Sequence, residues 1–252
     1  MMNIKQPVRP AIFAPTSVSR RIQEAMQLLP AVGTILITGS AGIGKSATIA
    51  DHCQSNTKAL PVELLQTHKS LRGLLVTIAN VFGVYTDRVR TQEVYNILTY
   101  RAEDCAERGE YIIIDEIQNA GADGIRSLLG LHEQTGMQMV LVGNEAAIKR
   151  TSANSAIYDQ IDSRLGIRLA LARPLPEDIQ SIGIEYGVEG ADAYRALLAF
   201  ESKSDIRRTV RLLQDARKLV GEMGPIRLPD LRDAATFRNL DVGDTLKLLS
   251  GH

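Results

Sequence analysis

The stretch Thr34-Ile-Leu-Ile-Thr-Gly-Ser-Ala-Gly-Ile-Gly-Lys-Ser46 decides the fold of this 252-residue chain. Its first five residues are apolar or β-branched and lie between glycines, which predicts a buried strand over 34–38. The rest matches G-x-x-x-x-G-K-[ST], and a helix is expected over 45–54, so the pattern has the strand-to-helix context of a phosphate-binding loop. The glycines let backbone N–H groups surround phosphate oxygens at the positive end of the helix dipole. The residues expected to bind phosphate are Gly39, Ser40, Ala41, Gly42, Ile43, Gly44, Lys45, Ser46 and Ala47.

Four side chains carry the chemistry expected of this loop. Lys45 should reach the β- and γ-phosphates of ATP, and Ser46 should hold Mg²⁺. A second apolar run, 111–114, ends in Asp115 and Glu116, about 70 residues after Lys45. Asp115 suits contact with Mg²⁺, directly or through water, and Glu116 suits orienting the attacking water. An acidic pair after a strand is also a common solvated turn, but beside a phosphate loop it favours an ATPase that uses ATP and Mg²⁺.

Strand and helix candidates alternate along the chain, which is typical of a parallel sheet covered by helices. Strands are expected over 34–38, 61–65, 111–114, 137–142 and 167–171, and helices over 45–54, 71–81 and 91–108. After Pro174 the strand signal stops, and helices are expected over 176–186, 191–200, 206–220 and 228–237. The prediction is an α/β P-loop NTPase fold with a five-stranded parallel sheet flanked by helices, followed by a small all-helical lid domain. The expected division is a linker segment over 1–30, a nucleotide-binding domain over 31–173, and a lid with a C-terminal tail over 174–252.

Further polar residues are candidates for completing the nucleotide site. Asn144 follows the 137–142 strand where the sheet meets the nucleotide crevice, or it forms a simple Gly-Asn turn. Arg164, with Arg168 as its rival, could reach a neighbouring subunit's γ-phosphate as an arginine finger. Arg207 opens a lid helix from which it could swing onto the phosphates. The alternative for each arginine is a solvated or salt-bridged surface residue.

Several of these motifs together resemble those of AAA+ ATPases over nearly the whole chain. They are the phosphate loop, Ile112–Glu116, Val140–Asn144, the Ser163-Arg164 arginine-finger position and the Asp205–Arg207 lid position. Four stretches are also similar to the Mu B family of phage transposition proteins: Ile113–Glu116, Leu141–Asn144, Asp162–Arg164 and the tail Phe237–Val242.

The second resemblance implies an ATP-dependent target-DNA activator. Such a protein assembles on double-stranded DNA as a homo-oligomer in the form of a helical filament or ring, recruits and stimulates a DDE transposase, and leaves the DNA when ATP is hydrolysed. The chain departs from this family in two respects. Only about 30 residues precede the phosphate-loop strand, too few for an amino-terminal helix-turn-helix domain, so DNA contacts are expected on the ATPase itself. The chain is also less basic than that family.

Charge is balanced overall but segregated along the chain. The 29 Lys and Arg match 29 Asp and Glu, which removes the simple argument for a nucleic-acid or membrane-surface partner. Locally, 1–21 carries +4 through Lys5, Arg9, Arg20 and Arg21, 66–101 carries +3, and 103–116 carries −5. The basic side chains expected to face DNA are Lys69, Arg72, Arg88 and Arg90.

Contacts of these side chains with phosphates would give salt-sensitive binding without sequence specificity, and many weak patches along a filament could suffice. The alternative is a solvated basic face. Aromatic residues make up 4% of the chain and Trp is absent, so an aromatic platform for stacked bases is not expected.

Composition also bounds the class of protein. A chain that is 44% apolar and 23% charged is neither disordered nor fibrous. Cys53 and Cys105 are expected as free thiols, the four histidines lack metal-ligand spacing, and no run is long and apolar enough for a membrane span. These features favour a cytoplasmic protein with no membrane partner. The competing function is another AAA+ ATPase switch, such as a helicase loader or a secretion-type ATPase, and a metabolic kinase is a weaker third reading.

Overall fold

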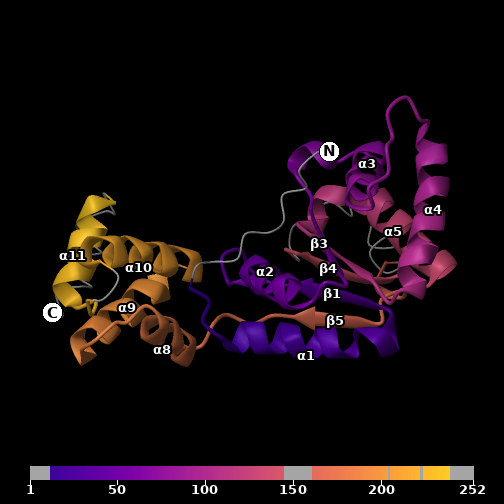
Figure 1. The fold of residues 1–252 in the computed structure, drawn as a ribbon. Helices are drawn as coiled ribbons and strands as arrows, with labels where there is room; N and C mark the ends of the chain where they lie inside the picture. The colour runs from indigo at the N-terminus through magenta and orange to yellow at the C-terminus, as the bar shows by residue number, and fades with distance from the viewer. Residues whose placement is uncertain (1–11, 145–160, 204, 222–223, 239–252) are drawn as a thin grey trace. The chain divides into compact units, whose positions relative to one another are not determined.

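Five parallel strands in the order β2-β3-β4-β1-β5 form the sheet of the computed structural model (Figure 1). The strands are β1 (Thr34–Thr38), β2 (Ala59–Glu63), β3 (Tyr111–Asp115), β4 (Gln138–Gly143) and β5 (Ile167–Ala170). The structure describes residues 12–144, 161–203, 205–221 and 224–238. Lys5, Arg9 and the end of the motif 237–242 lie outside these residues. The predicted α/β fold with a five-stranded parallel sheet is confirmed.

Strand β2 starts and ends two residues earlier than the sequence predicts. Its pairing with β3 runs from Ala59 opposite Tyr111 to Glu63 opposite Asp115. Pro61 lies in the middle of this strand and has no N–H to donate, which is tolerated because β2 is an edge strand. The apolar pair Leu64-Leu65, which drew the prediction toward 61–65, follows the strand instead.

Contacts divide the described chain into two units. The first holds 21–40, 45–144 and 161–171, and the second holds 12–20, 41–44 and 172–238. The domain limits expected from the sequence stay a prediction. No helix in the described part of the chain is both long and apolar enough to cross a membrane.

In the first unit, helices cover the sheet. α2 (Lys45–Ser55) follows the phosphate loop, and α3 (Leu71–Val81), α4 (Thr91–Glu107) and α5 (Gly121–Thr135) gather on one side (Figure 1). Ile112 and Ile114 of β3 belong to the same buried cluster as residues of these three helices. Ile113 between them is also fully buried, so the strand is covered on both faces, as in a central parallel strand.

A helix that the sequence does not predict, α1 (Ser17–Val32), begins in the linker segment expected over 1–30 and ends two residues beyond it. Its buried residues Val18, Ile22, Met26 and Leu29 recur at helical spacing, which explains why it forms. Pro30 lies inside the helix near its end.

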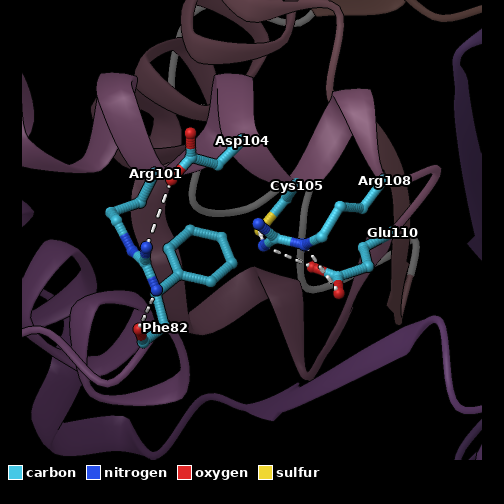
Figure 2. Close-up of polar contacts among 6 residues, drawn as sticks. All are labelled: Phe82, Arg101, Asp104, Cys105, Arg108 and Glu110. Carbon is cyan, nitrogen blue, oxygen red and sulfur yellow. Dashed lines mark hydrogen bonds and ion pairs between the residues drawn. The ribbon is translucent and has the colours of Figure 1, made fainter.

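The junction of α4 with β3 shows how the acidic stretch 103–116 is accommodated (Figure 2). Arg101 pairs with Asp104 at 3.2 Å, and its other nitrogen donates to the carbonyl oxygen of Phe82. Arg108 pairs with Glu110 at 2.9 Å, and this contact lowers the pKa of Glu110. Burial raises the pKa of the neighbouring Cys105 thiol to about 11, which keeps it protonated and unreactive at neutral pH.

The second unit is helical, with α8 (Pro176–Glu185), α9 (Ala191–Lys203), α10 (Ile206–Val220) and α11 (Leu228–Phe237). Its helices share one apolar core that includes Ile179, Leu197, Leu212 and Leu231. Asp178 is buried but satisfied, because it accepts hydrogen bonds from Leu175 N and, at 2.5 Å, from Ser17 N. The helical lid expected after Pro174 has the helices that the sequence predicts.

Candidate functional site

The phosphate loop joins β1 to α2. Gly42 and Gly44 have φ values of +81° and +102°, a backbone region that favours glycine, and an added Cβ at Gly44 would meet no atom within 4 Å. Ile43 between them is buried and anchors the loop. Lys45 Nζ donates to the carbonyl oxygens of Gly39 at 2.9 Å and Ser40 at 2.8 Å. The ammonium is therefore held against the loop, and the loop has open space at Gly44, which fits phosphate oxygens.

The expected Mg²⁺ ligands lie together. Ser46, at the start of α2, donates its hydroxyl to Asp115 Oδ2 at 2.6 Å, and Asp115 is the last residue of β3. A hydroxyl and a carboxylate are oxygen ligands of the kind that Mg²⁺ takes, and Mg²⁺ completes its shell with waters and substrate phosphates. The residues present thus fit this ion.

Glu116 follows with an unusual backbone. Its φ of 57° and ψ of 40° are left-handed, and among the described non-glycine residues only Arg88 shares a positive φ. Its N–H donates to Asp115 Oδ1 at 2.8 Å, so the two acidic residues are fixed to each other. A left-handed non-glycine residue of this kind marks a position that the surroundings over-determine.

Gln118 is a site residue that the sequence analysis missed. It lies in the short 3-10 helix η2 (Ile117–Ala120), and its side-chain amide donates to Glu116 Oε2. Its Oε1 accepts a hydrogen bond from Asn144 N at 3.2 Å. An amide two residues after an acidic pair was the available signal, but its significance depends on β3 and β4 lying side by side.

Asn144 lies where the sequence predicts, directly after β4. The strand end is tied to the phosphate loop because Gly39 N donates to Gly143 O at 3.3 Å. The carboxyl ends of β1, β3 and β4 form one edge of the sheet. This edge brings together five predicted site residues: Lys45, Ser46, Asp115, Glu116 and Asn144. The roles assigned to these residues stay predictions.

The two arginine-finger candidates are both near the surface of the first unit. Arg164 pairs with Glu133 at 3.3 Å, with side chains 44% and 50% exposed. Arg168 lies on β5 and pairs with Asp162 at 3.1 Å. Both arginines are thus salt-bridged in the single chain, and neither pair is buried.

Arg207 lies beside a glycine of the phosphate loop within the second unit. Its backbone N–H donates to Gly42 O at 3.2 Å. Asp205, the N-cap of α10, accepts from Arg208 N, and an added Cβ at Gly42 would lie 2.5 Å from its carboxyl carbon. Gly42 is therefore needed for space as well as for its backbone conformation.

Four basic side chains expected to face DNA are exposed in the first unit: Lys69, Arg72, Arg88 and Arg90. Arg72 Nη1 donates to Val89 O at 2.7 Å, which fixes the loop that carries Arg88 and Arg90 next to the start of α3. In the described part of the chain, none of the four makes an ion pair. We call these four residues the basic patch.

Comparison with known proteins agrees with this geometry. A protein-family model described as an AAA domain matches residues 32–151. The chain is 23% identical over 205 residues to the Mu-like prophage FluMu DNA transposition protein B of Haemophilus influenzae, covering 80% of this chain and 70% of that protein. It is also 23% identical over 241 residues to the ATP-dependent target DNA activator B of Escherichia phage Mu, covering 92% and 75%.

A solved structure with a similar fold is that of the Aeropyrum pernix ORC2 protein, described as ADPNP-ADP complexes. Its TM-score is 0.65 with 19% sequence identity, and the match covers 97% of this chain and 74% of that one. At this identity the likeness concerns the fold alone. The chain therefore has the AAA+ fold, and its sequence is similar to those of the B proteins of a Mu-like prophage and of phage Mu.

Proposed function

We propose that this protein is an ATPase that binds DNA without sequence specificity and acts in transposition. The observation that carries the ATPase part is the grouping of Ser46, Asp115 and Glu116 at the edge of the sheet, next to the phosphate loop. Lys45 would exchange its two carbonyl partners for phosphate oxygens, and Glu116 would orient the water that attacks the γ-phosphate. Mg²⁺, when bound, neutralises charge on the β- and γ-phosphates; Ser46 and Asp115 would hold it.

The DNA part rests on the basic patch and on the relatives. The basic patch is exposed and makes no ion pair with any residue that the structure describes, so its guanidinium and ammonium groups are suited to phosphates. The similar protein of phage Mu is named ATP-dependent target DNA activator B. The neutral net charge means that one subunit offers few contacts. We therefore propose that ATP drives assembly of a homo-oligomer, as a ring or a helical filament, on double-stranded DNA. The weak DNA contacts of the basic patches on several subunits would then act together.

The partner of such a DNA-bound assembly would be a DDE transposase, which the protein would recruit and activate. It would act in the cytoplasm, with 31–173 as its nucleotide-binding domain and 174–252 as its lid. The alternative, a helicase loader or secretion-type ATPase switch, shares the same phosphate loop and acidic pair. The similarity to two transposition B proteins over most of the chain favours the first function.

Retention on duplex DNA in the two nucleotide states tests this function. With ATP and Mg²⁺ the protein should remain on DNA as an oligomer, with ADP it should dissociate, and Glu116→Gln should bind ATP but stay on the DNA. Lys45→Ala, which should bind no nucleotide, is the control for ATP-dependent loading. Equal DNA affinity with ATP and ADP across a salt titration would exclude the proposal, and a Glu116→Gln variant with normal hydrolysis would remove that residue's role.

A further inference from the structure

The Gln118 side chain contacts two predicted site residues, Glu116 after β3 and Asn144 after β4. Its side-chain nitrogen donates to the Glu116 carboxylate, and its side-chain oxygen accepts from Asn144 N. The orientation of the amide follows from chemistry, because a carboxylate only accepts hydrogen bonds and a backbone N–H only donates them. In the reversed orientation the amide oxygen would face the Glu116 carboxylate, and the amide NH₂ would face the Asn144 N–H, so neither hydrogen bond could form. The end of β3 is thereby linked to the residue after β4 through one side chain.

The Gln118 side chain fills the space beside Gly143, and only glycine leaves room for it there. An added Cβ at Gly143 would lie 2.5 Å from Gln118 Oε1 and 2.8 Å from Ile117 Cγ2, closer than real Cβ contacts. Gly143 does not have a positive φ, so glycine is required here for room and not for backbone conformation. Any larger residue at the end of β4 would displace the amide from Asn144 or from Glu116.

We propose that Gln118 is a positioning residue for ATP hydrolysis, and this rests on the ATPase function proposed above. The backbone of Glu116 is already fixed by its left-handed conformation and by the hydrogen bond to Asp115. Gln118 fixes what the backbone leaves free, the side-chain torsions, by occupying one carboxylate oxygen and leaving the other for water. A neutral amide does this without compensating the negative charge on which Glu116 depends to orient that water.

The hydrogen bond to Asn144 also couples the position of Glu116 to the end of β4. Because its oxygen is bonded to the Asn144 N–H, a shift of the residue after β4 moves the same side chain that holds Glu116. Asn144 is expected to face the nucleotide from the end of β4. Gln118 therefore sets the position of Glu116 according to the position of that strand end, and it needs no contact with ATP to do so.

A matched control lies one residue away. Asn119, in the same short helix, donates from Nδ2 to Leu64 O at 2.8 Å, so its side chain is directed away from the Glu116 carboxylate. Its backbone N–H donates to Glu116 O at 2.9 Å, and Asn119→Ala keeps this backbone bond. Gln118→Ala and Asn119→Ala each remove one amide hydrogen-bonding group from η2. Only the first should affect the placement of Glu116. Gln118→Met keeps the length of the side chain without its hydrogen bonds and should behave like Gln118→Ala.

The experiment measures kcat and KM for ATP, the affinity for a fluorescent ATP analogue, and amide hydrogen exchange at Asn144. For Gln118→Ala we expect kcat to fall about tenfold or more, as for loss of a positioned catalytic group, with KM and analogue affinity within about twofold. Exchange at the Asn144 amide should accelerate in Gln118→Ala and Gln118→Met but not in Asn119→Ala. Gly143→Ala should reproduce the kcat effect with Gln118 intact.

Two results would overturn the proposal. One is an unchanged kcat in Gln118→Ala. The other is a fall in kcat that is matched by equal losses of analogue affinity and by a similar fall in Asn119→Ala, which would indicate a general structural role. Failure of the transposition function is distinguishable, because a chain that hydrolyses ATP with the expected Gln118 dependence but does not bind DNA would refute the DNA part alone. A wild-type chain that hydrolyses no ATP would overturn both.

Discussion

Ser46 Oγ and Asp115 Oδ2 lie 2.6 Å apart, although 69 positions separate the two residues in the chain. Ser46 lies at the start of α2, after the phosphate loop that follows β1, and Asp115 is the last residue of β3. In the sheet, β4 lies between β1 and β3. The hydrogen bond therefore spans the position of β4 at the carboxyl edge of the sheet. It brings together the two oxygen ligands that the sequence predicts for Mg²⁺.

Asp115→Asn should weaken the binding of Mg²⁺ without unfolding the protein. The amide keeps the size of the carboxylate but loses its charge, so the Mg²⁺ concentration that gives half-maximal hydrolysis should rise about tenfold or more. Binding of ATP in the absence of Mg²⁺ should change little, because Lys45 and the loop backbone remain. Ser46→Ala is the companion variant, and additive effects of the two changes would contradict a shared metal site.

The fold was predictable where one segment carries its own signal, and the site only in part. Helix α3 begins and ends at the predicted residues because its apolar spacing and its N-cap Ser70 act locally. The phosphate loop and Asp115 follow from short motifs. Gln118 could not be found this way, since its two partners meet only after β3 and β4 pair. The left-handed backbone of Glu116 also has no signal in the residue type, because glutamate rarely adopts it.

Thr38→Val should stabilise the protein. The Thr38 hydroxyl is buried at the end of β1 and has no hydrogen-bond partner in the part of the chain that the structure describes. Burying an unsatisfied hydroxyl costs about 1–3 kcal/mol, and valine has nearly the same shape. Urea unfolding should therefore show a midpoint raised by the equivalent of about 1 kcal/mol with an unchanged m-value. Thr34→Val is the control and should destabilise, because the Thr34 hydroxyl accepts from Gly166 N at 2.9 Å.

His52 should make the stability of the protein depend on pH. Burial lowers its pKa, against a smaller opposing effect of Asp51, and the ring lies 2.5 Å from the Tyr111 hydroxyl. The folded state thus resists protonation of a group that the unfolded chain protonates near pH 6.5, so stability is complete above that pH and falls as the pH decreases below it.

Thermal unfolding between pH 7.5 and 5.5 checks this expectation. The melting temperature of the wild type should fall with acidification more steeply than that of His52→Gln, which cannot titrate. Parallel slopes for wild type and His52→Gln would show that other groups dominate the pH dependence.

Arg164→Ala should remove hydrolysis by the assembled protein while leaving the single chain stable. Its ion pair with Glu133 is half-exposed, and such pairs contribute about 0–1 kcal/mol, so the arginine can leave Glu133 readily. If it acts on the neighbouring subunit's ATP, mixing Arg164→Ala with Lys45→Ala subunits should restore part of the activity. Arg168→Ala is the rival variant, and a co-assembled mixture with no recovery for Arg164→Ala would rule out its action in trans.

The basic patch should determine how steeply DNA binding depends on salt. Arg88→Ala removes one phosphate contact per subunit, which should reduce the slope of log K against log salt by about 0.9 for each subunit that engages DNA. Arg72→Ala should weaken binding further, since Arg72 also holds the carbonyl of Val89 and so the loop that presents Arg88 and Arg90. Arg108→Ala is the control, because Arg108 is paired with Glu110 outside the patch. An Arg72→Ala variant no weaker than Arg88→Ala would show that the hydrogen bond to Val89 does not organise the patch, and equal slopes for all three variants would place the DNA elsewhere on the protein.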